Sequence, residues 1–444
     1  MGKDFSRGKW VALFHPPIYD FTAYDLWLRP LGLYRLGAYI KNYTDLALFL
    51  FDYMDRSSPL APPTKSRKYG TGKFYKERVE KPRFLKEVKR YFYRFGIPRA
   101  SMEAFMEKFP PPLAVFITTG MTYWYLGVKE VVRSVKKIWG NVPIFLGGTY
   151  ATLMPSHASQ FGKVLKGEAG CESVEVLGAL SGRRFPCGDE PPAAFELSRA
   201  PSTVTATTRG CPFRCTFCAS FLLHRWKKRP IWEVLEELEG AVKLSIKDIA
   251  LYDDALLVDA QGHFKPLFRE VVRQGWNLRF HLPNGLHVRF VDEEVAWLMK
   301  RANFKTLRLS LESVDEEFLK ERTPKLRLEE FERAVFHLEK AGFSRREMVA
   351  YVIVGVPGQR ASSVLKTLDY LEKIGIKPSL AYYSPVPGTK DFQVLVHEGY
   401  FPPEHDPLLH NKLLFPYSGY SPIGEEEFEK IRKRAFEIAF NLRA

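Results

Sequence analysis

The N-terminal part of the chain alternates short, uninterrupted apolar runs with stretches of helical periodicity. Four runs have the length of a strand, and they begin at Trp10, Leu46, Leu113 and Pro143. Between the last two runs, apolar residues recur at helical spacing: Val128, Val131, Val132, Val135, Ile138 and Trp139. Continuous apolar strands are typical of a parallel sheet covered on both faces. We therefore expect a doubly wound, Rossmann-like domain over residues 1–180, with a Pro-rich, basic insertion at about 57–112. Such sheets bind ligands outside the carboxyl ends of their strands.

From Thr203 onward the pattern becomes a regular succession of strand, loop and helix. Six strand candidates begin at Thr203, Asp248, Leu278, Thr306, Met348 and Ser379. The helices between them include apolar stripes at Ile231–Val242 and Phe331–Ala341, the second closed by Gly342. Six such units in a row predict a (β/α)6 partial TIM barrel over residues 203–390. A Gly- and Pro-rich linker, 181–202, precedes the barrel. A small C-terminal extension, 391–444, follows it and ends in an amphipathic helix near Glu425–Leu442.

Composition agrees with a folded α/β protein of more than one domain. The chain has 444 residues, of which 45% are hydrophobic and 26% charged, which is typical of globular proteins. No apolar run is long enough to span a membrane. The chain has 5 cysteines, and three of them are clustered, which favours metal binding or catalysis over a disulfide framework. We expect a cytoplasmic protein.

The net charge of +15 is concentrated in one segment. Residues Lys65–Lys108 hold 14 Lys or Arg and 5 Asp or Glu, interleaved with aromatic residues. One interpretation is a surface for anionic partners. The other is a solvated basic helix.

Residues suited to a site follow each predicted strand of the barrel. In chain order they are the cysteine cluster, Asp253 with Asp254, Pro283 to Gly285, Glu312 with Ser313, the segment from Gly355, and the segment from Ser384. Chemistry in parallel barrels occurs at the carboxyl ends of the strands, so these groups are expected to converge on one mouth. Each also has a structural alternative: Glu312 could cap a helix starting near Asp315, and the Gly-Pro pairs could be ordinary turns.

Three cysteines, Cys211, Cys215 and Cys218, lie within eight residues. Three thiolates at this spacing can hold three corners of a 4Fe-4S cube and leave the fourth iron open. The alternative is a structural zinc site, which needs a fourth ligand such as Cys187 or His224.

This C-x3-C-x2-C pattern, with Phe217 before the last cysteine, resembles the signature of radical S-adenosylmethionine (SAM) enzymes. The resemblance extends over residues 203–389 and includes "YDDALLVD", "LPNGLHVRF", "LRLSLESVDEEFLK", "VIVGVPGQ" and "YYSPVPGT" in family order. It implies that the three cysteines ligate a 4Fe-4S cluster whose open iron binds SAM. The SAM-binding residues that it implies are Phe217, Asp253, Asn284, Glu312, Ser313, Gly355, Val356 and Pro357. One departure is Gln359, where relatives often carry Glu.

The first domain resembles the cobalamin-binding domain that precedes the radical domain in one branch of this family. The matching stretch runs from "FITTGMTYWYLG" to "IFLGGTYATLMPSHA" and on to "KGEAG". The cobalamin-binding residues that it implies are Thr118, Thr119, Gly120, Met121, Tyr123, Trp124, Gly147, Gly148, Thr149 and Tyr150. The Asp-x-His-x-x-Gly motif, with which mutase-type domains place a histidine under cobalt, does not occur.

The resemblance implies a cobalamin-dependent radical SAM enzyme, with methyl transfer to an unactivated carbon as the leading reaction and no catalytic residue assigned. The alternatives are a radical SAM enzyme without functional cobalamin that catalyses cyclisation, rearrangement or carbon–carbon coupling, and a zinc-stapled protein that binds nucleic acid or a membrane surface. Methylthio transfer to RNA is disfavoured because the first domain lacks three further cysteines. The expected partners are a small-molecule, lipid or peptide substrate and an electron donor such as flavodoxin or ferredoxin, and nucleic acid is not expected.

Overall fold

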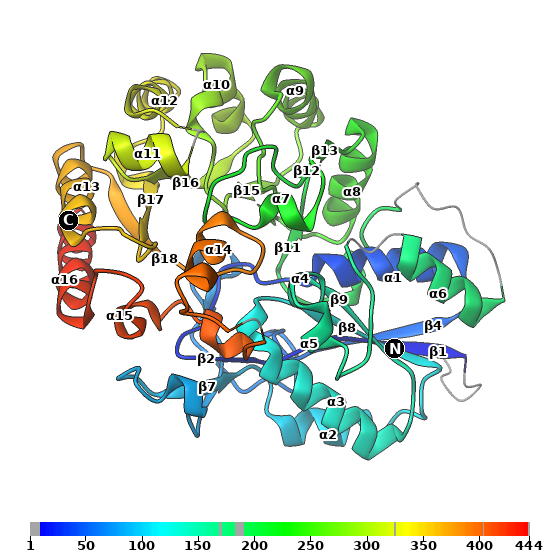
Figure 1. Cartoon of the computed structure of the whole chain (residues 1–444). Coiled ribbons are helices and arrows are strands. Elements are labelled where there is room, and N and C mark those ends of the chain that lie inside the picture. Colours follow the sequence, from blue (N-terminus) through cyan, green and yellow to red (C-terminus); the bar gives the residue numbers. More distant parts are fainter. Residues whose placement is uncertain (1–8, 168–170, 183–190, 324–325, 403, 443–444) are drawn as a thin grey trace. The chain divides into compact units, whose positions relative to one another are not determined.

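The computed structural model describes residues 9–167, 171–182, 191–323, 326–402 and 404–442. The chain forms two compact units (Figure 1). The first comprises Met1–Val204 and Trp232–Lys247, and the second Thr205–Ile231 and Asp248–Ala444. Cys187, considered above as a zinc ligand, lies outside the described residues.

The first unit is built on a five-stranded sheet in the order β10-β9-β8-β1-β4, paired in parallel throughout. Its strands are β1 (Trp10–His15), β4 (Ala47–Asp52), β8 (Ala114–Thr119), β9 (Ile144–Gly148) and β10 (Lys163–Val164). The first four are the four apolar runs of the sequence. Chain order reverses between β1 and β8, and such a switch point is where doubly wound sheets bind ligands.

Helices complete the first unit: α1 (Leu31–Tyr43), α3 (Tyr125–Trp139), α4 (Thr149–Leu153), α5 (Pro155–Ala158), α6 (Cys171–Ser181) and α8 (Ile231–Lys243). The predicted stripe of α3 faces inward, since Val131 and Val135 are fully buried while Arg133 and Lys136 are exposed. Aromatic packing fills the core between helix and sheet: the rings of Trp10 and Trp139 meet edge to face at 5.6 Å.

The basic segment is not a helix over most of its length, so the expectation of a solvated basic helix was wrong. It forms β5 (Gly72–Lys73), β6 (Lys76–Val79) and β7 (Phe92–Phe95), and only then α2 (Arg99–Met106). β6 and β7 pair antiparallel with each other, and β7 pairs with β2 (Ile18–Asp20), which lies far back in the chain. β5 pairs with β3 (Tyr24–Asp25). Burial alternates along β6 with the period of a strand.

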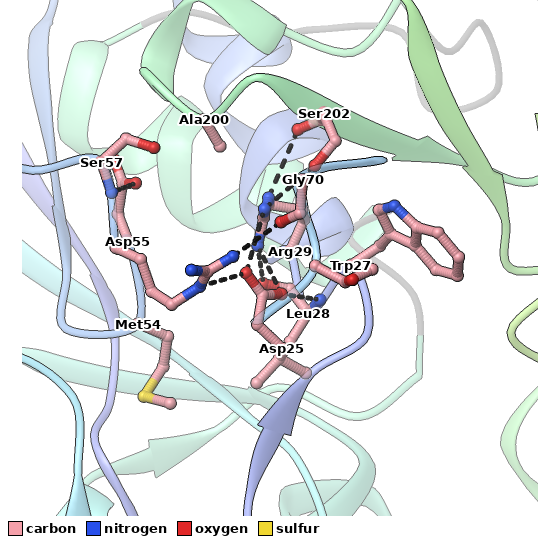
Figure 2. A network of polar contacts seen from close by, with 12 residues as sticks. Asp25, Trp27, Leu28, Arg29, Met54, Asp55, Ser57, Gly70, Ala200 and Ser202 are labelled. Atoms are coloured by element: carbon pink, nitrogen blue, oxygen red, sulfur yellow. Dashed lines mark hydrogen bonds and ion pairs between the residues drawn. The ribbon is translucent and has the colours of Figure 1, made fainter. Parts of the chain in front are cut away.

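A buried network of ion pairs holds the insertion to the rest of the first unit (Figure 2). The carboxylate of Asp25 accepts hydrogen bonds from Arg29, at 3.0 and 3.3 Å, and from Arg56, at 2.9 Å. Arg29 also donates to the backbone oxygen and hydroxyl of Ser202, and Arg56 donates to the backbone oxygen of Gly70. Buried charges need such pairing, so this network fixes where Ser202, the first residue of β11, lies within the unit.

The described part of the predicted linker also packs onto this unit. Residues 191–202 contain the 3-10 turn η4 (Phe195–Leu197), and the ring of Phe195 meets that of Tyr34 edge to face at 6.0 Å. A Cβ on Gly37 would lie 2.4 Å from Leu197, so glycine permits this close approach of α1. The apolar side chains within the Gly- and Pro-rich segment give it this fixed course.

The second unit carries a six-stranded sheet in the order β11-β14-β15-β16-β17-β18, with β14 to β18 parallel. The strands are β11 (Ser202–Thr205, which crosses the boundary between the units), β14 (Asp248–Leu251), β15 (Arg279–His281), β16 (Phe304–Glu312), β17 (Met348–Val354) and β18 (Lys377–Tyr382). The helices are α7 (Ser220–Leu223), α9 (Lys265–Gln274), α10 (Glu293–Arg301), α11 (Glu316–Arg322), α12 (Leu328–Lys340) and α13 (Ala361–Lys373). All six predicted strands are present, and the predicted fold class is confirmed.

Short elements join these strands and helices. A two-stranded ribbon consists of β12 (Thr208–Arg209) and β13 (Lys227–Lys228). The 3-10 turns outside η4 are η1 (Lys68–Gly70), η2 (Arg83–Leu85), η3 (Thr122–Trp124), η6 (Val288–Phe290), η7 (Arg345–Glu347) and η8 (Pro407–His410), and η5 (Ala260–Phe264) is a π-turn.

The C-terminal segment covers β18, the last strand of the second sheet. It contains α14 (Lys390–His397), α15 (Phe415–Ser418) and α16 (Glu425–Asn441). The Phe428 ring of α16 packs edge to face against Tyr382, at 5.1 Å. Covering an edge strand prevents unwanted strand pairing. The predicted final helix corresponds to α16.

Candidate active site

The three cysteines lie in one loop whose two ends pair as antiparallel strands. The loop leaves β12 and returns through α7 to β13, and Arg209 of β12 pairs with Lys227 of β13. Gly210, directly before Cys211, has a φ of 65°, and a Cβ there would lie 2.3 Å from the backbone oxygen of His224. Only glycine tolerates both conditions. The sequence "RGC" is therefore a structural requirement of the loop.

None of the three cysteines forms a disulfide; Cys215 is buried, and Cys211 and Cys218 are partly exposed. Within the loop, the backbone nitrogen of Cys218 donates to the backbone oxygen of Cys215 at 3.1 Å. Among the described residues, no group of three or more His, Cys, Asp or Glu side chains is placed to hold a single metal ion. Three cysteine thiols within eight residues, none of them in a disulfide, match the donor set of a three-corner iron-sulfur site.

Asp253, in the loop directly after β14, holds the residues that lead into the cysteine loop. Its carboxylate accepts hydrogen bonds from the backbone nitrogens of Thr207 and Thr208, the shortest being 2.6 Å, and from both threonine hydroxyls at 2.8 Å. Asn284, at the end of β15, donates to the backbone oxygens of Tyr252 and Asp253, each at 3.2 Å. The structure therefore brings these two predicted SAM-binding residues together. The Asp253 carboxylate is used to position the loop.

The neighbouring Asp254 faces the cysteines through a serine. Ser220 donates to Oδ1 of Asp254 at 2.9 Å, and its hydroxyl lies 3.4 Å from Sγ of Cys218. Burial raises the pKa of Asp254, and the nearby charge of Asp253 adds to the effect, although the hydrogen bond from Ser220 opposes it.

A second set of contacts holds the middle of the loop, and sequence reasoning missed it. The backbone nitrogen of Thr216 donates to the backbone oxygen of Arg322. The backbone oxygen of Thr216 accepts from the backbone nitrogen of Asp391. Arg322 closes the set by pairing with Asp391 at 2.5 Å and by donating to the backbone oxygen of Pro357 at 2.9 Å. These partners are 35 and 69 positions from Arg322, and no local pattern in the sequence connects them.

Glu312 and Ser313 end β16 at an irregularity in the sheet, where the register shifts between Ser310 and Glu312. Glu312 is buried and has a φ of 64°, a conformation that non-glycine residues rarely adopt and that concentrates at functional sites. The structural alternative for Glu312 was wrong, because the cap of α11 is Asp315, which accepts from the backbone nitrogen of Phe318. Ser313 accepts from the backbone nitrogen of Asp315.

Gln359 holds the loop after β17, which contains Gly355, Val356 and Pro357. Oε1 of Gln359 accepts from the backbone nitrogen of Gly355 at 2.7 Å, and Nε2 donates to the backbone oxygen of Ile353 at 3.0 Å. Both functions of the amide are therefore used. Gly355 has a φ of 94°, and a Cβ there would lie 2.6 Å from the ring of Phe415.

Phe217, the aromatic residue of the motif, is half-buried beside Cys218. An aromatic residue that the sequence analysis did not select, Phe213, places its ring 5.1 Å from the imidazole of His287. The spacing of the motif gave no signal for this contact, because His287 lies in the loop after β15.

In the first unit, the loops after β8 and β9 are joined at the carboxyl edge of the sheet. The hydroxyl of Thr119 donates to the backbone oxygen of Gly147 at 2.8 Å and accepts from the backbone nitrogen of Ala151. Tyr150 donates its backbone N–H to the backbone oxygen of Gly120 at 3.0 Å. A Cβ on Gly147 would meet only one atom, at 3.8 Å, whereas Gly148, with a φ of 98°, touches the backbone of Thr119.

The predicted cobalamin residues differ in their exposure. Gly120 and Met121 are exposed, and Thr118, Gly147, Gly148 and Thr149 are half-buried, so these groups offer surface to a ligand. Tyr123 and Tyr150 are buried, and the hydroxyl of Tyr150 bonds to Nδ1 of His157 at 2.6 Å. These two side chains therefore pack inside the unit, beneath the exposed loop residues. Trp124 is half-buried and donates to Asp20 at 3.1 Å. The open Cα face of Gly147, with the exposed Gly120 on the neighbouring loop, fits the close approach of a large flat cofactor.

Residues 205–371 match the sequence model of the Radical SAM superfamily. The chain carries a radical SAM domain. The match begins at the end of β11 and covers the cysteine loop and the strand ends described above, which confirms the predicted family resemblance and the enzyme class. A 4Fe-4S cluster and SAM, as predicted, are the cofactors of this family.

Relatives of known name are similar over most of the chain. An uncharacterized methyltransferase of Pyrococcus horikoshii, PH0819, is 23% identical over 390 residues, which cover 76% of this chain and 80% of that protein. The methyltransferase TsrM of Kitasatospora setae, solved with cobalamin and a [4Fe-4S] cluster bound, matches with a TM-score of 0.66 and 15% identity over 97% of this chain and 89% of that one.

The cobalamin-dependent SAM radical enzyme OxsB, solved with aqua-cobalamin bound, matches with a TM-score of 0.57 and 12% identity. The match covers 88% of this chain and 55% of OxsB, so the chain spans about half the length of that protein. At these identities, the two solved structures show that the fold is shared across both units. The assignments of single residues to SAM or cobalamin stay predictions.

Proposed function

We propose that this chain is a cobalamin-dependent radical SAM enzyme that transfers a methyl group to an unactivated carbon. The observation that carries the proposal is the cysteine loop. Three cysteines lie within it at the carboxyl ends of the strands of a radical SAM domain, and the β12–β13 pairing and Asp253 hold the loop in place. The likeness to two solved cobalamin-containing proteins and to a protein named as a methyltransferase supports the cobalamin and the methyl transfer.

In this proposal, Cys211, Cys215 and Cys218 hold a 4Fe-4S cluster. When bound, the reduced cluster and SAM supply one-electron chemistry, and cobalamin supplies a carrier for the methyl group. The task of the chain is to orient these groups. Asp253 and the Arg322–Asp391 pair fix the loop from two sides, so the thiols are presented by rigid supports.

SAM is assigned to the strand ends beside that loop. Glu312 and Ser313 offer polar atoms at the end of β16, and Asn284 adds an amide at the end of β15. The backbone of Gly355 to Pro357 offers a surface for the adenine, and Gln359 and Arg322 hold that backbone in place. Cobalamin is assigned to the carboxyl edge of the first sheet, around Thr118, Gly147 and Thr149.

In this proposal a small redox protein such as a flavodoxin or a ferredoxin supplies the electrons, in a reducing, cytoplasmic compartment that keeps the three cysteines out of disulfides. The part of the chain that the structure describes contains no helix with the length and apolar character to span a membrane.

The cluster is tested by anaerobic reconstitution. Wild-type protein is expected to bind about four irons with sulfide and to produce 5'-deoxyadenosine from SAM under reducing conditions. Replacing Cys211, Cys215 and Cys218 together by Ala is expected to abolish both. Replacing the two remaining cysteines, Cys171 and Cys187, is the matched control and is expected to change neither. Retained 5'-deoxyadenosine in the triple variant, or one zinc in place of the irons, would contradict the proposal.

Cobalamin and methyl transfer are tested separately. Titration with hydroxocobalamin is expected to show saturable binding at one site per chain. One equivalent of S-adenosylhomocysteine per chain is expected when SAM is added to the reduced, cobalamin-loaded protein, and none without cobalamin. Cleavage of SAM without any cobalamin binding would instead support a radical enzyme that has no functional cobalamin.

A further inference from the structure

The two faces of the second unit's sheet differ in burial. Helices α9, α10, α12 and α13 lie along one side of the strands (Figure 1). On β16, Leu307 and Leu309 are at most 1% exposed, whereas Arg308 between them is partly exposed. On β17, Ala350 is fully buried and the next residue, Tyr351, is partly exposed. Because side chains alternate between the two faces of a strand, Arg308 and Tyr351 lie on the face away from these helices.

The side chain of Arg308 is directed toward the carboxyl edge of this sheet. Arg308 is the register partner of Val349 on β17, but its guanidinium carbon lies 5.5 Å from the ring centre of Tyr351, two residues further along that strand. The hydroxyl of Tyr351 donates to the backbone oxygen of Pro283 at 2.6 Å. Pro283 directly precedes Asn284, a predicted SAM-binding residue. The guanidinium therefore leans toward the strand ends to which SAM is assigned.

The charge of Arg308 has no counter-ion in the part of the chain that the structure describes. Its Nε is buried without a hydrogen-bond partner. No described carboxylate pairs with its guanidinium, including that of Glu312 at the end of the same strand. Burial raises the pKa of Tyr351, so the neighbouring phenol is neutral and supplies no negative charge.

Arg279 of β15 provides a comparison on the same face. It lies two residues before His281, whose ring is 3.3 Å from the hydroxyl of Thr306, and Thr306 lies two residues before Arg308 on β16. Nε of Arg279 donates to Asp248 at 2.8 Å, and Asp248 is also 2.9 Å from Nε2 of His281. The charge of Arg279 is therefore neutralised within the protein, whereas that of Arg308 is not.

A partly buried cation without a counter-ion destabilises a protein unless a ligand supplies the anion. The planar guanidinium matches a carboxylate, which it binds through two parallel hydrogen bonds, and it can stack on an aromatic ring at the same time. We infer that Arg308 binds the carboxylate of the substrate, so that the substrate is an organic acid. This inference rests on the proposed function and names the class of its substrate.

SAM also carries a carboxylate, but the residues assigned to SAM lie further out. Glu312 follows Arg308 by four residues, which is about 13 Å along an extended strand. In the proposed function, the open iron of the cluster and the strand ends hold SAM. A carboxylate bound at Arg308 therefore belongs to a molecule that reaches deeper into the sheet than SAM does.

Stability without substrate tests the missing counter-ion. Arg308→Met removes the uncompensated charge and keeps an apolar side chain against Tyr351. The thermal unfolding midpoint of the cluster- and cobalamin-loaded protein is therefore expected to rise or to stay unchanged. Arg279→Met, the matched control, leaves Asp248 without its arginine and is expected to lower the midpoint clearly. Equal decreases in the two variants would show that Arg308 has a partner within the protein, and would overturn the inference.

Small acids test the carboxylate. The loaded protein with SAM is titrated calorimetrically, at constant ionic strength, with three pairs of an acid and its amide: acetate and acetamide, benzoate and benzamide, and phenylacetate and phenylacetamide. Wild-type protein is expected to bind at least one acid about 10-fold or more tightly than its amide, as charge-assisted hydrogen bonds provide. This preference is expected to disappear in Arg308→Met and to persist in Arg301→Met, which removes an exposed arginine of α10.

The affinity for SAM distinguishes the two sources of a carboxylate. Equilibrium dialysis is expected to give a dissociation constant of SAM within about 2-fold of wild type in Arg308→Met. A loss of about 10-fold or more would assign Arg308 to the carboxylate of SAM and overturn the inference. Wild-type protein that cleaves SAM but prefers none of the acids would also overturn it and leave the proposed function intact. If wild-type protein neither binds iron nor cleaves SAM, the inference fails together with the proposed function.

Discussion

Asp253 and Thr208 are joined by two short hydrogen bonds, 2.6 Å to the backbone nitrogen and 2.8 Å to the hydroxyl of the threonine. Together with the bonds to Thr207, they surround the carboxylate with donors only. An amide at this position would turn an N–H₂ group toward a backbone N–H. Asp253→Asn is therefore expected to cost about 1–3 kcal/mol of stability and to lower the iron bound per chain after reconstitution, which iron analysis and thermal unfolding measure.

The neighbouring Asp254 provides the matched control. Burial raises its pKa, so a neutral amide is a closer substitute there, and Asn can still accept from Ser220. Asp254→Asn is therefore expected to cost less stability than Asp253→Asn and to lower the iron bound per chain by less. Equal losses in the two variants would show that Asp253 has no special part in positioning the loop.

The apolar pattern predicted both sheets because parallel strands buried on two faces must be apolar throughout. The runs at Trp10 and Met348 became β1 and β17 with small changes at the ends. The basic insertion was harder to predict: β7 pairs with β2, whose Tyr19 lies opposite Arg94, and no local period encodes a partner so distant. Its Lys and Arg content suggested a solvated helix, although burial along β6 follows a period of two.

The residues of the candidate site were likewise predictable only where a local pattern marks them. The residues that end each strand of the radical SAM domain were found because they interrupt an apolar run. The supports of the cysteine loop were not found, since Arg322 and Asp391 meet Thr216 only through tertiary structure.

Gln359 allows a sharp test of a departure from the family pattern. Its amide accepts from Gly355 and donates to the backbone oxygen of Ile353 in a buried setting. Gln359→Glu removes the donor and sets a carboxylate against that carbonyl, at an expected cost of about 1–3 kcal/mol at neutral pH. A protonated Glu can donate again, so its folded-state pKa is raised and the deficit should shrink as pH falls toward about 5. Urea unfolding at two pH values measures both effects.

The exposed Gln393 on α14 is the control for this change. Gln393→Glu is expected to alter stability by no more than about 0.5 kcal/mol at either pH. If Gln359→Glu behaves in the same way, the amide of Gln359 does not support the loop at Gly355.

Asp25 is expected to be far more important for stability than any surface carboxylate of the first unit. Asp25→Asn leaves Arg29 and Arg56 without their shared partner in a buried position (Figure 2), and breaking a buried pair in this way costs about 3–5 kcal/mol. Asp45→Asn removes an exposed partner of Lys9, at 3.8 Å, and is expected to cost less than about 1 kcal/mol. Urea unfolding of the two variants should differ clearly, and similar midpoints would rule out a supporting role for the network.

The lowered pKa of Glu103 predicts that the first unit loses stability in acid. Burial opposes its ionisation, but hydrogen bonds from Lys137, Ser134 and Arg99 outweigh burial and lower its pKa to about 2. A carboxyl whose folded-state pKa is depressed stabilises the protein above its unfolded pKa, and this contribution is lost as pH falls toward the folded value. Because Lys137 and Arg99 are partly exposed, water screens the pairs, and we expect about 1–2 kcal/mol. Wild-type protein should therefore lose this amount between about pH 4.5 and 2.

Glu103→Gln should lose less stability over the same range, while Glu107→Gln, at an exposed position one turn later, should follow the wild type. Acid unfolding curves that coincide for all three proteins would show that the bonds around Glu103 do not contribute to the stability of the fold.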